Sequence, residues 1–143
     1  MILSTSGINE RNLQIRKAVL VYAFATLFCI VFSTVYEHYG HGVYSNFMVY
    51  LFLFPLIGGV LPFTLLRLTR HGAFPPRISF NLYNSGIATL AVGSAMQGAL
   101  EIYGTTSNYM PVYWNVGIAL IVMATILYFF SVSGRMVSRK RRV

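Results

Sequence analysis

Charged residues are scarce in this chain. Only 10% of its 143 residues are charged and 56% are hydrophobic, whereas about a quarter of the residues of an ordinary soluble domain are charged. Acidic side chains are especially few, because Glu10, Glu37 and Glu101 are the whole set. A chain of this length forms one domain, and a composition this apolar is typical of a membrane protein.

The residues needed for several kinds of chemistry are missing. Cys29 is the single cysteine, which excludes an intrachain disulfide and a two-thiol redox site; its apolar neighbours indicate a buried residue. The patterns G-x-S-x-G, G-K-[ST] and G-x-G-x-x-G do not occur. No histidine lies within an expected span, so haem held between helices is excluded. We therefore predict no enzyme activity and no cofactor.

Four apolar segments are long enough to cross a bilayer, which takes about 20 helical residues. They are residues 18–36, 47–66, 82–103 and 113–132, and they predict an all-α protein with four transmembrane helices in an antiparallel bundle, followed by a basic tail at 133–143. A signal peptide is the competing interpretation of the first segment. We reject it because the segment is too long and no small-x-small cleavage site follows.

The basic residues orient the predicted helices. All eleven lysines and arginines precede the first span, separate the second from the third, or follow the fourth. By the positive-inside rule, both termini and the second connection lie in the cytoplasm, and the protein is a multi-pass protein of the cell membrane. Five basic residues of the tail are expected to contact anionic lipid headgroups of the cytoplasmic leaflet rather than nucleic acid. They are Arg135, Arg139, Lys140, Arg141 and Arg142.

The third span carries small residues along one stripe, with spacings of four, three, four and three residues. This pattern predicts a seam along which another helix packs closely. The stripe consists of Asn84, Ala88, Ala91, Ala95 and Gly98. Gln97 and Glu101 lie one turn apart at its far end. Glu101 either faces the bundle and carries a proton during transport, or reaches water or a histidine at the membrane edge; we favour the second.

The second span is expected to be irregular. It contains Pro55, Gly58, Gly59 and Pro62 within the sequence FPLIGGVLP, and each proline removes a backbone donor. A kink or local unwinding near the middle of the membrane follows. Broken helices also form binding sites in transporters, but proline and glycine are common in ordinary spanning helices, and we favour a plain kink.

A cluster of polar residues is expected at the outer ends of the first and third spans. Glu37, His38, His41 and Glu101 would suit a zinc ion or another divalent metal. A histidine-x-x-histidine pair in a glycine-containing loop is a weak pattern, however. We favour a polar cluster that faces water.

Four short helices in a small chain resemble the small multidrug resistance transporters. The resemblance fails at the coupling glutamate of that family, which lies in the middle of the first helix, where this chain has Leu27, Phe28 and Cys29. Our first hypothesis is therefore a small, non-catalytic subunit or accessory of a membrane assembly, with itself or a larger membrane protein as partner. A small homo-oligomeric transporter or channel that uses Gln97 and Glu101 is the alternative, and a membrane enzyme ranks last.

Overall fold

All the regular structure in the described part of the chain is helical. The computed structural model describes residues 3–40, 42–68 and 74–140, and the side chains of 10–40, 42–68 and 74–133. The elements are α1 (Leu3–Tyr39), α2 (Asn46–Val49), α3 (Leu53–Pro55), the π-helical turn η1 (Leu56–Val60), α4 (Leu61–Leu68), α5 (Arg77–Ile102) and α6 (Met110–Lys140). The all-α prediction is confirmed for these residues.

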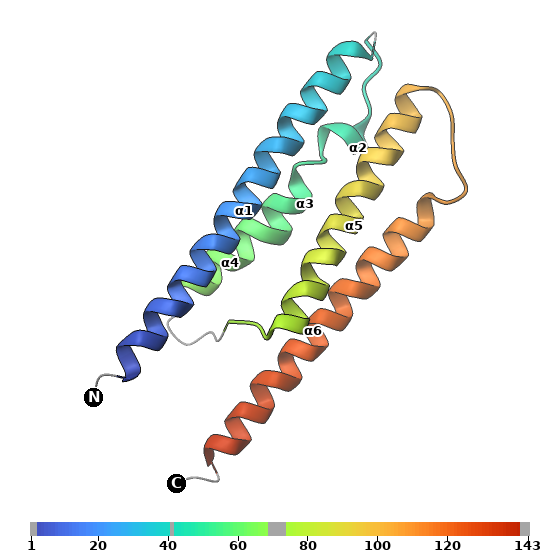
Figure 1. The fold of residues 1–143 in the computed structure, drawn as a ribbon. Coiled ribbons are helices and arrows are strands. Elements are labelled where there is room, and N and C mark those ends of the chain that lie inside the picture. Colours follow the sequence, from blue (N-terminus) through green and yellow to red (C-terminus); the bar gives the residue numbers. More distant parts are fainter. Residues whose placement is uncertain (1–2, 41, 69–73, 141–143) are drawn as a thin grey trace.

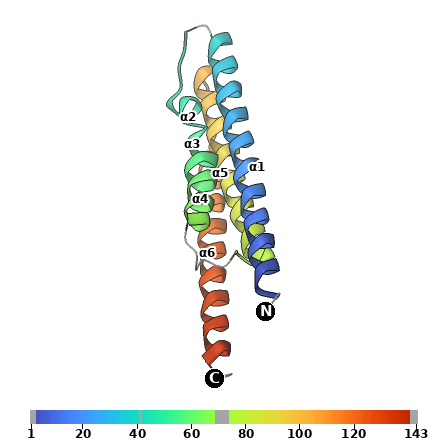
Figure 2. The ribbon, with the colours of Figure 1, turned by 90° about the vertical axis from the view of Figure 1, so that its left-hand side faces the viewer.

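The helices form rods that lie side by side and alternate in direction (Figure 1). Helices α1, α5 and α6 are each one long rod, and the short elements α2, α3, η1 and α4 follow one another along another rod. The start of α1 and the end of α6 therefore lie at the same end of the molecule (Figures 1 and 2). We call this the terminal end, and the opposite one the distal end.

The short elements join the long helices. The η1 turn, α3 and α4 pack along α1, whereas α2 and α3 also pack on α5, and α6 packs along α5. Helices α1 and α6 lie at opposite edges (Figure 1). Two clusters fill the interior. The one nearer the terminal end is built from Ile15, Ala18, Tyr22, Phe63 and Ile87, and the one nearer the distal end from Cys29, Met48 and Leu51.

Two helices in the described residues are long and apolar enough to cross a membrane, namely Glu10–Tyr39 and Met110–Ser133. The other two expected spans differ from them for separate reasons. The segment 47–66 is interrupted after Val49, which leaves only the shorter apolar helix Leu53–Leu68. Helix α5 is continuous but is rich in glycine, serine and amide residues, and α2, α3 and α6 pack on it.

The helices extend beyond the predicted apolar segments. Helix α1 begins at Leu3 rather than at residue 18, and α6 continues to Lys140 rather than ending at 132. Hydropathy marks where side chains stop being apolar. Backbone hydrogen bonding continues through both polar flanks, neither of which contains a proline.

Candidate functional site

The largest group of polar side chains at the distal end lines a pocket of about 690 Å³ between α5, the connection 103–109 and α6. We call it the α5–α6 pocket. Its lining residues are Phe47, Gln97, Leu100, Glu101, Thr105, Thr106, Ser107, Met110, Pro111, Trp114 and Asn115. The two residues singled out from the sequence for a polar pathway, Gln97 and Glu101, are thus in one pocket.

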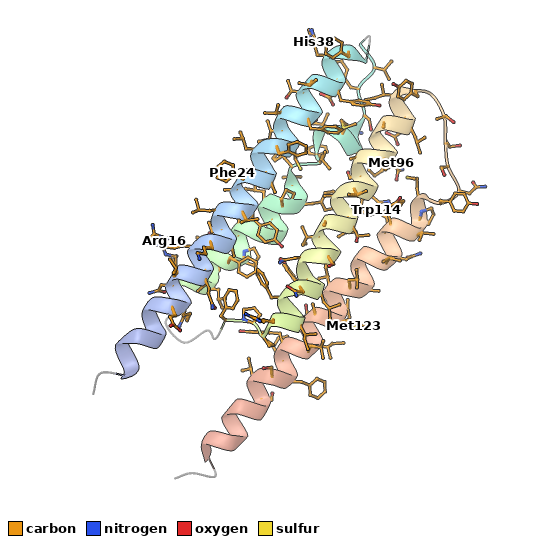
Figure 3. All side chains as sticks on the ribbon, viewed as in Figure 1. Arg16, Phe24, His38, Met96, Trp114 and Met123 are labelled. Atoms are coloured by element: carbon orange, nitrogen blue, oxygen red, sulfur yellow. The ribbon has the colours of Figure 1, made fainter. Side chains whose placement is uncertain are left out.

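Both of these residues have a hydrogen-bond partner from another element. The indole nitrogen of Trp114 donates to Oε1 of Gln97 at 3.2 Å, and the buried hydroxyl of Ser45 donates to Oε2 of Glu101 at 2.6 Å. The ring of Trp114 also packs on Phe47, with ring centroids 6.0 Å apart. Figure 3 shows Trp114 at this end of α6. The contacts fix the α5 side of the pocket against both neighbouring segments.

The chemistry of the α5–α6 pocket is that of a binding surface. A carboxylate, an amide and threonine hydroxyls offer hydrogen-bond acceptors and one negative charge. Ser45 donates to the carboxylate of Glu101 itself, and a serine used in this way is not activated by a histidine or lysine base. The arrangement therefore supports recognition of a polar or cationic group better than nucleophilic catalysis.

The described residues predicted to hold a metal come from two helices, Glu37 and His38 from α1 and Glu101 from α5. His38 is exposed near the end of α1, as Figure 3 shows. Its ring packs edge to face on the ring of Tyr39, with ring centroids 5.5 Å apart. Glu37 is half-buried, and Glu101 bonds to Ser45. His41 lies outside the described residues. Within the described residues, no three histidine, cysteine, aspartate or glutamate side chains gather where they could hold a metal ion.

The irregularity expected around Pro55 and Pro62 is present as the π-helical turn η1. Its two glycines allow close packing on both sides. A Cβ atom on Gly58 would collide with the side chain of Ile87 in α5, and one on Gly59 would collide with the ring of Tyr22 in α1. The glycines therefore serve helix packing, and both neighbouring helices cover the turn.

The break between α2 and α3 is stabilised by two serines, Ser33 of α1 and Ser94 of α5. The amide of Leu51 bonds to the carbonyl of Met48, three residues back, rather than to that of Phe47. Ser94 of α5 donates to the Phe47 carbonyl at 2.7 Å, and Ser33 of α1 donates to the Met48 carbonyl at 2.8 Å. Both serines are buried. Carbonyls that a broken helix leaves without a partner must be satisfied inside the protein.

The small-residue stripe of α5 has three different surroundings. Asn84 accepts a hydrogen bond from the hydroxyl of Tyr22 at 2.6 Å, Gly98 packs against the backbone of Met48, and Ala88 is exposed. Ala91 and Ala95 pack at the edge of the distal cluster.

A close helix–helix approach uses a neighbouring face of α5. A Cβ atom on Gly86 would lie 2.9 Å from the carbonyl oxygen of Gly117 in α6, and one on Gly117 would lie 3.2 Å from the carbonyl oxygen of Gly86. A Cβ atom on Gly93 would lie 2.6 Å from Cβ of Tyr113. Pairing glycine positions between the third and fourth spans could have identified this contact from the sequence.

The basic tail falls largely outside the structural description. Arg135, Arg139 and Lys140 belong to the last turns of α6, but their side chains lie outside the described set, as do residues Arg141 and Arg142 entirely. Their predicted contact with lipid headgroups stays a prediction.

Comparison of the chain with protein-family models, with curated proteins and with solved structures finds no match. Function is therefore inferred from the residues and their geometry.

Proposed function

We propose that this chain is a multi-pass protein of the cell membrane that works as a small, non-catalytic subunit or accessory of a membrane assembly. The observation that carries the membrane assignment is the exposure of α6. Only 11% of the most apolar 18-residue stretch of α6 is buried. A core helix of a soluble protein would be mostly buried, and a signal sequence would lie near the N-terminus. Helix α6 fits neither description.

The exposed face of α6 is continuous and large. Transfer of a whole apolar side chain from water to an apolar medium is worth roughly 1.5–3 kcal/mol, so a half-exposed side chain of this face loses about half of that if it stays in water. Hydrocarbon removes that penalty, so the exposed face supports lipid as the solvent. Its large apolar residues with about half or more of their surface exposed are Val112, Val116, Ile118, Val122, Met123, Ile126, Phe129 and Phe130.

The distribution of charge along the rods supports a four-span topology with both termini in the cytoplasm. The described cations Arg11, Arg16, Lys17, Arg67 and Arg77 all belong to the terminal end. Of the three acidic residues, Glu10 lies near the start of α1 at the terminal end, and Glu37 and Glu101 lie near the ends of α1 and α5 at the distal end, where none of the described lysines and arginines lies. A protein with this separation places its cationic end in the cytoplasm. On this proposal α5 and the rod of α2 to α4 cross the membrane too, shielded from lipid in part by their neighbours.

The proposed role as a subunit rests on the helix surface that no other part of the described chain covers. The connections described between helices are short and carry no soluble domain, and α6 uses one face for α5 while its other face is uncovered. Helices associate in lipid through packing and interhelical hydrogen bonds rather than through the hydrophobic effect. The uncovered face of α6 is therefore available to lipid and to a partner helix alike.

Transport remains the alternative, and the α5–α6 pocket is the observation that favours it, because a carboxylate lines a hollow at one membrane face. Against this, Gln97 and Glu101 bond to Trp114 and Ser45, and η1 is packed between α1 and α5. Purified protein in liposomes decides the question. Proton- or ion-coupled flux that Glu101→Gln abolishes would establish transport, and we expect no such flux.

Purification in mild detergent tests the subunit role. We expect the tagged full-length protein to co-purify with a larger membrane protein in a fixed ratio. Ile118→Trp, which changes the exposed face of α6, should reduce that ratio, whereas Phe24→Trp on the exposed face of α1 serves as the matched control. Recovery of a lone monomer from every mild detergent would contradict the role while leaving the membrane assignment intact.

A further inference from the structure

A groove of about 1090 Å³ lies between α1 and α5. We call it the α1–α5 groove. No acidic residue lines it. One wall is formed by α1, with Gln14, Lys17, Ala18, Val21, Tyr22, Ala25 and Cys29. The other wall is formed by α5, with Arg77, Phe80, Asn81, Asn84, Ile87, Ala88, Ala91 and Val92. The remaining lining residues are Pro55, Phe74, Pro75 and Pro76. Val21 and Val92 are more than half exposed, so the groove is open at its rims.

The α5 wall changes from charged to apolar along its length. From the terminal end it presents Arg77, then Asn81 and Asn84, then Ala88 and Ala91. The spacings are four, three, four and three residues, so these residues follow one face of the helix. This face is the N-terminal continuation of the small-residue stripe. The order is a cation, two amides and two methyl groups.

The α1 wall changes in the same sense. Gln14 and Lys17 stand at the terminal end, and Ala18, Ala25 and Cys29 follow toward the distal end. Helices α1 and α5 point in the same direction (Figure 1), so the two polar mouths coincide and the two apolar stretches face each other. The side chains of Lys17 and Arg77 are both exposed at that mouth.

The floor of the groove is fixed by the hydrogen bond between Tyr22 and Asn84. Tyr22 is buried, whereas Asn84 is half-buried. An amide group has two donor hydrogens besides its acceptor oxygen, and Nδ2 of Asn84 donates to none of the described residues. Both donor hydrogens of this amide therefore remain, about 10 Å beyond Arg77 at a helical rise of about 1.5 Å per residue.

The dimensions match one leaflet of a bilayer. The apolar stretch of the α1 wall, from Ala18 to Cys29, is about 16 Å long at that rise. Half of a hydrocarbon core of about 30 Å is about 15 Å. An acyl chain of the leaflet at the terminal end thus has the length of the apolar part, with its headgroup at the level of Lys17 and Arg77.

From this graded pair of walls we infer that the α1–α5 groove binds an anionic phospholipid of the cytoplasmic leaflet. Lys17 and Arg77 bind the phosphate, the amides of Asn81 and Asn84 hydrogen-bond the glycerol ester carbonyls, and one acyl chain lies against Ala25, Ala88 and Ala91. The inference rests on the proposed membrane topology and goes beyond it, since a spanning protein needs no headgroup-selective groove.

Native mass spectrometry of full-length protein in non-ionic detergent, titrated with phosphatidylglycerol, tests this site. Each basic residue near an anionic group contributes about fivefold in affinity, so Lys17→Gln with Arg77→Gln should weaken binding about 25-fold. The matched control is Arg16→Gln with Arg67→Gln, which removes the same charge from the same end at exposed residues outside the groove. We expect the control to change binding less than threefold, and phosphatidylcholine to bind weakly to all three proteins.

A second pair of variants separates a seated lipid from a diffuse charge effect. Ala88→Trp fills the groove and should abolish retention of phosphatidylglycerol, whereas Ala119→Trp on the exposed face of α6 should preserve it. Equal weakening by both charge pairs, or full retention by Ala88→Trp, would overturn the site. So would a disulfide between two copies of Ala88→Cys, because a second copy would then occupy the groove. Recovery of the wild-type protein in the soluble fraction would instead refute the membrane topology itself.

Discussion

The hydroxyl of Tyr22 donates to Oδ1 of Asn84 at 2.6 Å and thereby joins α1 to α5. The same ring covers Gly59 of the π-helical turn and stacks on Phe63 of α4 with centroids 5.7 Å apart. One side chain of α1 thus contacts two other rods, α5 and the one that contains η1 and α4. In surroundings with few competing polar groups, such a hydrogen bond also specifies which face of α1 packs against which face of α5.

Removing the hydroxyl alone tests this junction. We expect Tyr22→Phe to lower the free energy of unfolding by about 1 kcal/mol, in line with single interhelical hydrogen bonds. The ring still packs on Gly59, so no larger loss follows. Tyr50→Phe, at an exposed tyrosine, is the control. Unfolding in sodium dodecyl sulfate, with Asn84→Ala completing a double-mutant cycle, measures the coupling; a coupling of zero would refute the bond.

The crossing of α5 and α6 depends on glycine at two positions. We expect Gly86→Ala to destabilise the protein by about 1–3 kcal/mol, because its Cβ would lie 2.6 Å from Cγ1 of Ile121 and 2.9 Å from the Gly117 carbonyl. Alanine is intrinsically the better helix former by roughly 1 kcal/mol, so a net loss would come from the lost close approach. Ser85→Ala, at the exposed adjacent residue, should have little effect in the same unfolding assay. Stabilisation by Gly86→Ala would contradict the crossing.

The break between α2 and α3 depends on Ser33 and Ser94. Ser94→Ala leaves the Phe47 carbonyl without its partner, which costs about 1–3 kcal/mol. The Met48 carbonyl still accepts from the Leu51 amide, so Ser33→Ala should cost only about 1 kcal/mol, the net contribution of one hydrogen bond. Thr34→Ala is the control, because Thr34 is exposed and bonds only to the carbonyl of Ile30 in its own helix. Thermal unfolding in detergent should rank Ser94→Ala and Ser33→Ala well below Thr34→Ala. Equal stability of all three variants would mean that water or lipid headgroups satisfy these carbonyls.

The depth of Trp114 is measurable because it is the only tryptophan in the chain. In liposomes, its fluorescence should be quenched more by lipids brominated near the headgroup than by lipids brominated near the chain end. The control variant carries Trp114→Phe with Met123→Trp, which moves the indole about 13 Å along α6; Figure 3 marks both positions. The fluorescence of that variant should be quenched more by lipids brominated near the chain end than by lipids brominated near the headgroup. Stronger deep quenching of Trp114 itself would contradict its interfacial depth.

The sequence predicts the helical fold and the irregular second segment because both depend on local properties. Hydropathy identifies apolar segments, and Pro55 and Pro62 remove backbone donors wherever they lie. The sequence predicts the position of the helix interruption less well. The chain breaks at Tyr50 to Phe52, before the prolines, because Ser33 and Ser94 from two other helices offer hydrogen bonds to the carbonyls of Met48 and Phe47.

Packing partners were harder to predict for the same reason. The helical period predicts the stripe from Asn84 to Gly98, but periodicity does not say which neighbouring helix covers a given face. Gly86 lies on the face that meets α6, and Ala88 is exposed in the α1–α5 groove. Likewise, Gln97 and Glu101 were predicted as polar residues at one end, whereas their partners Trp114 and Ser45 follow only from the arrangement of the rods.

Accessibility of introduced cysteines tests the membrane topology most directly. The native thiol is first removed by Cys29→Ala, and a membrane-impermeant maleimide is then added to intact cells. We predict that Ser107→Cys, in the connection between α5 and α6, is labelled, and that Gly72→Cys, between α4 and α5, is labelled only after the membrane is permeabilised. Labelling of Gly72→Cys in intact cells together with protection of Ser107→Cys would contradict the proposed topology.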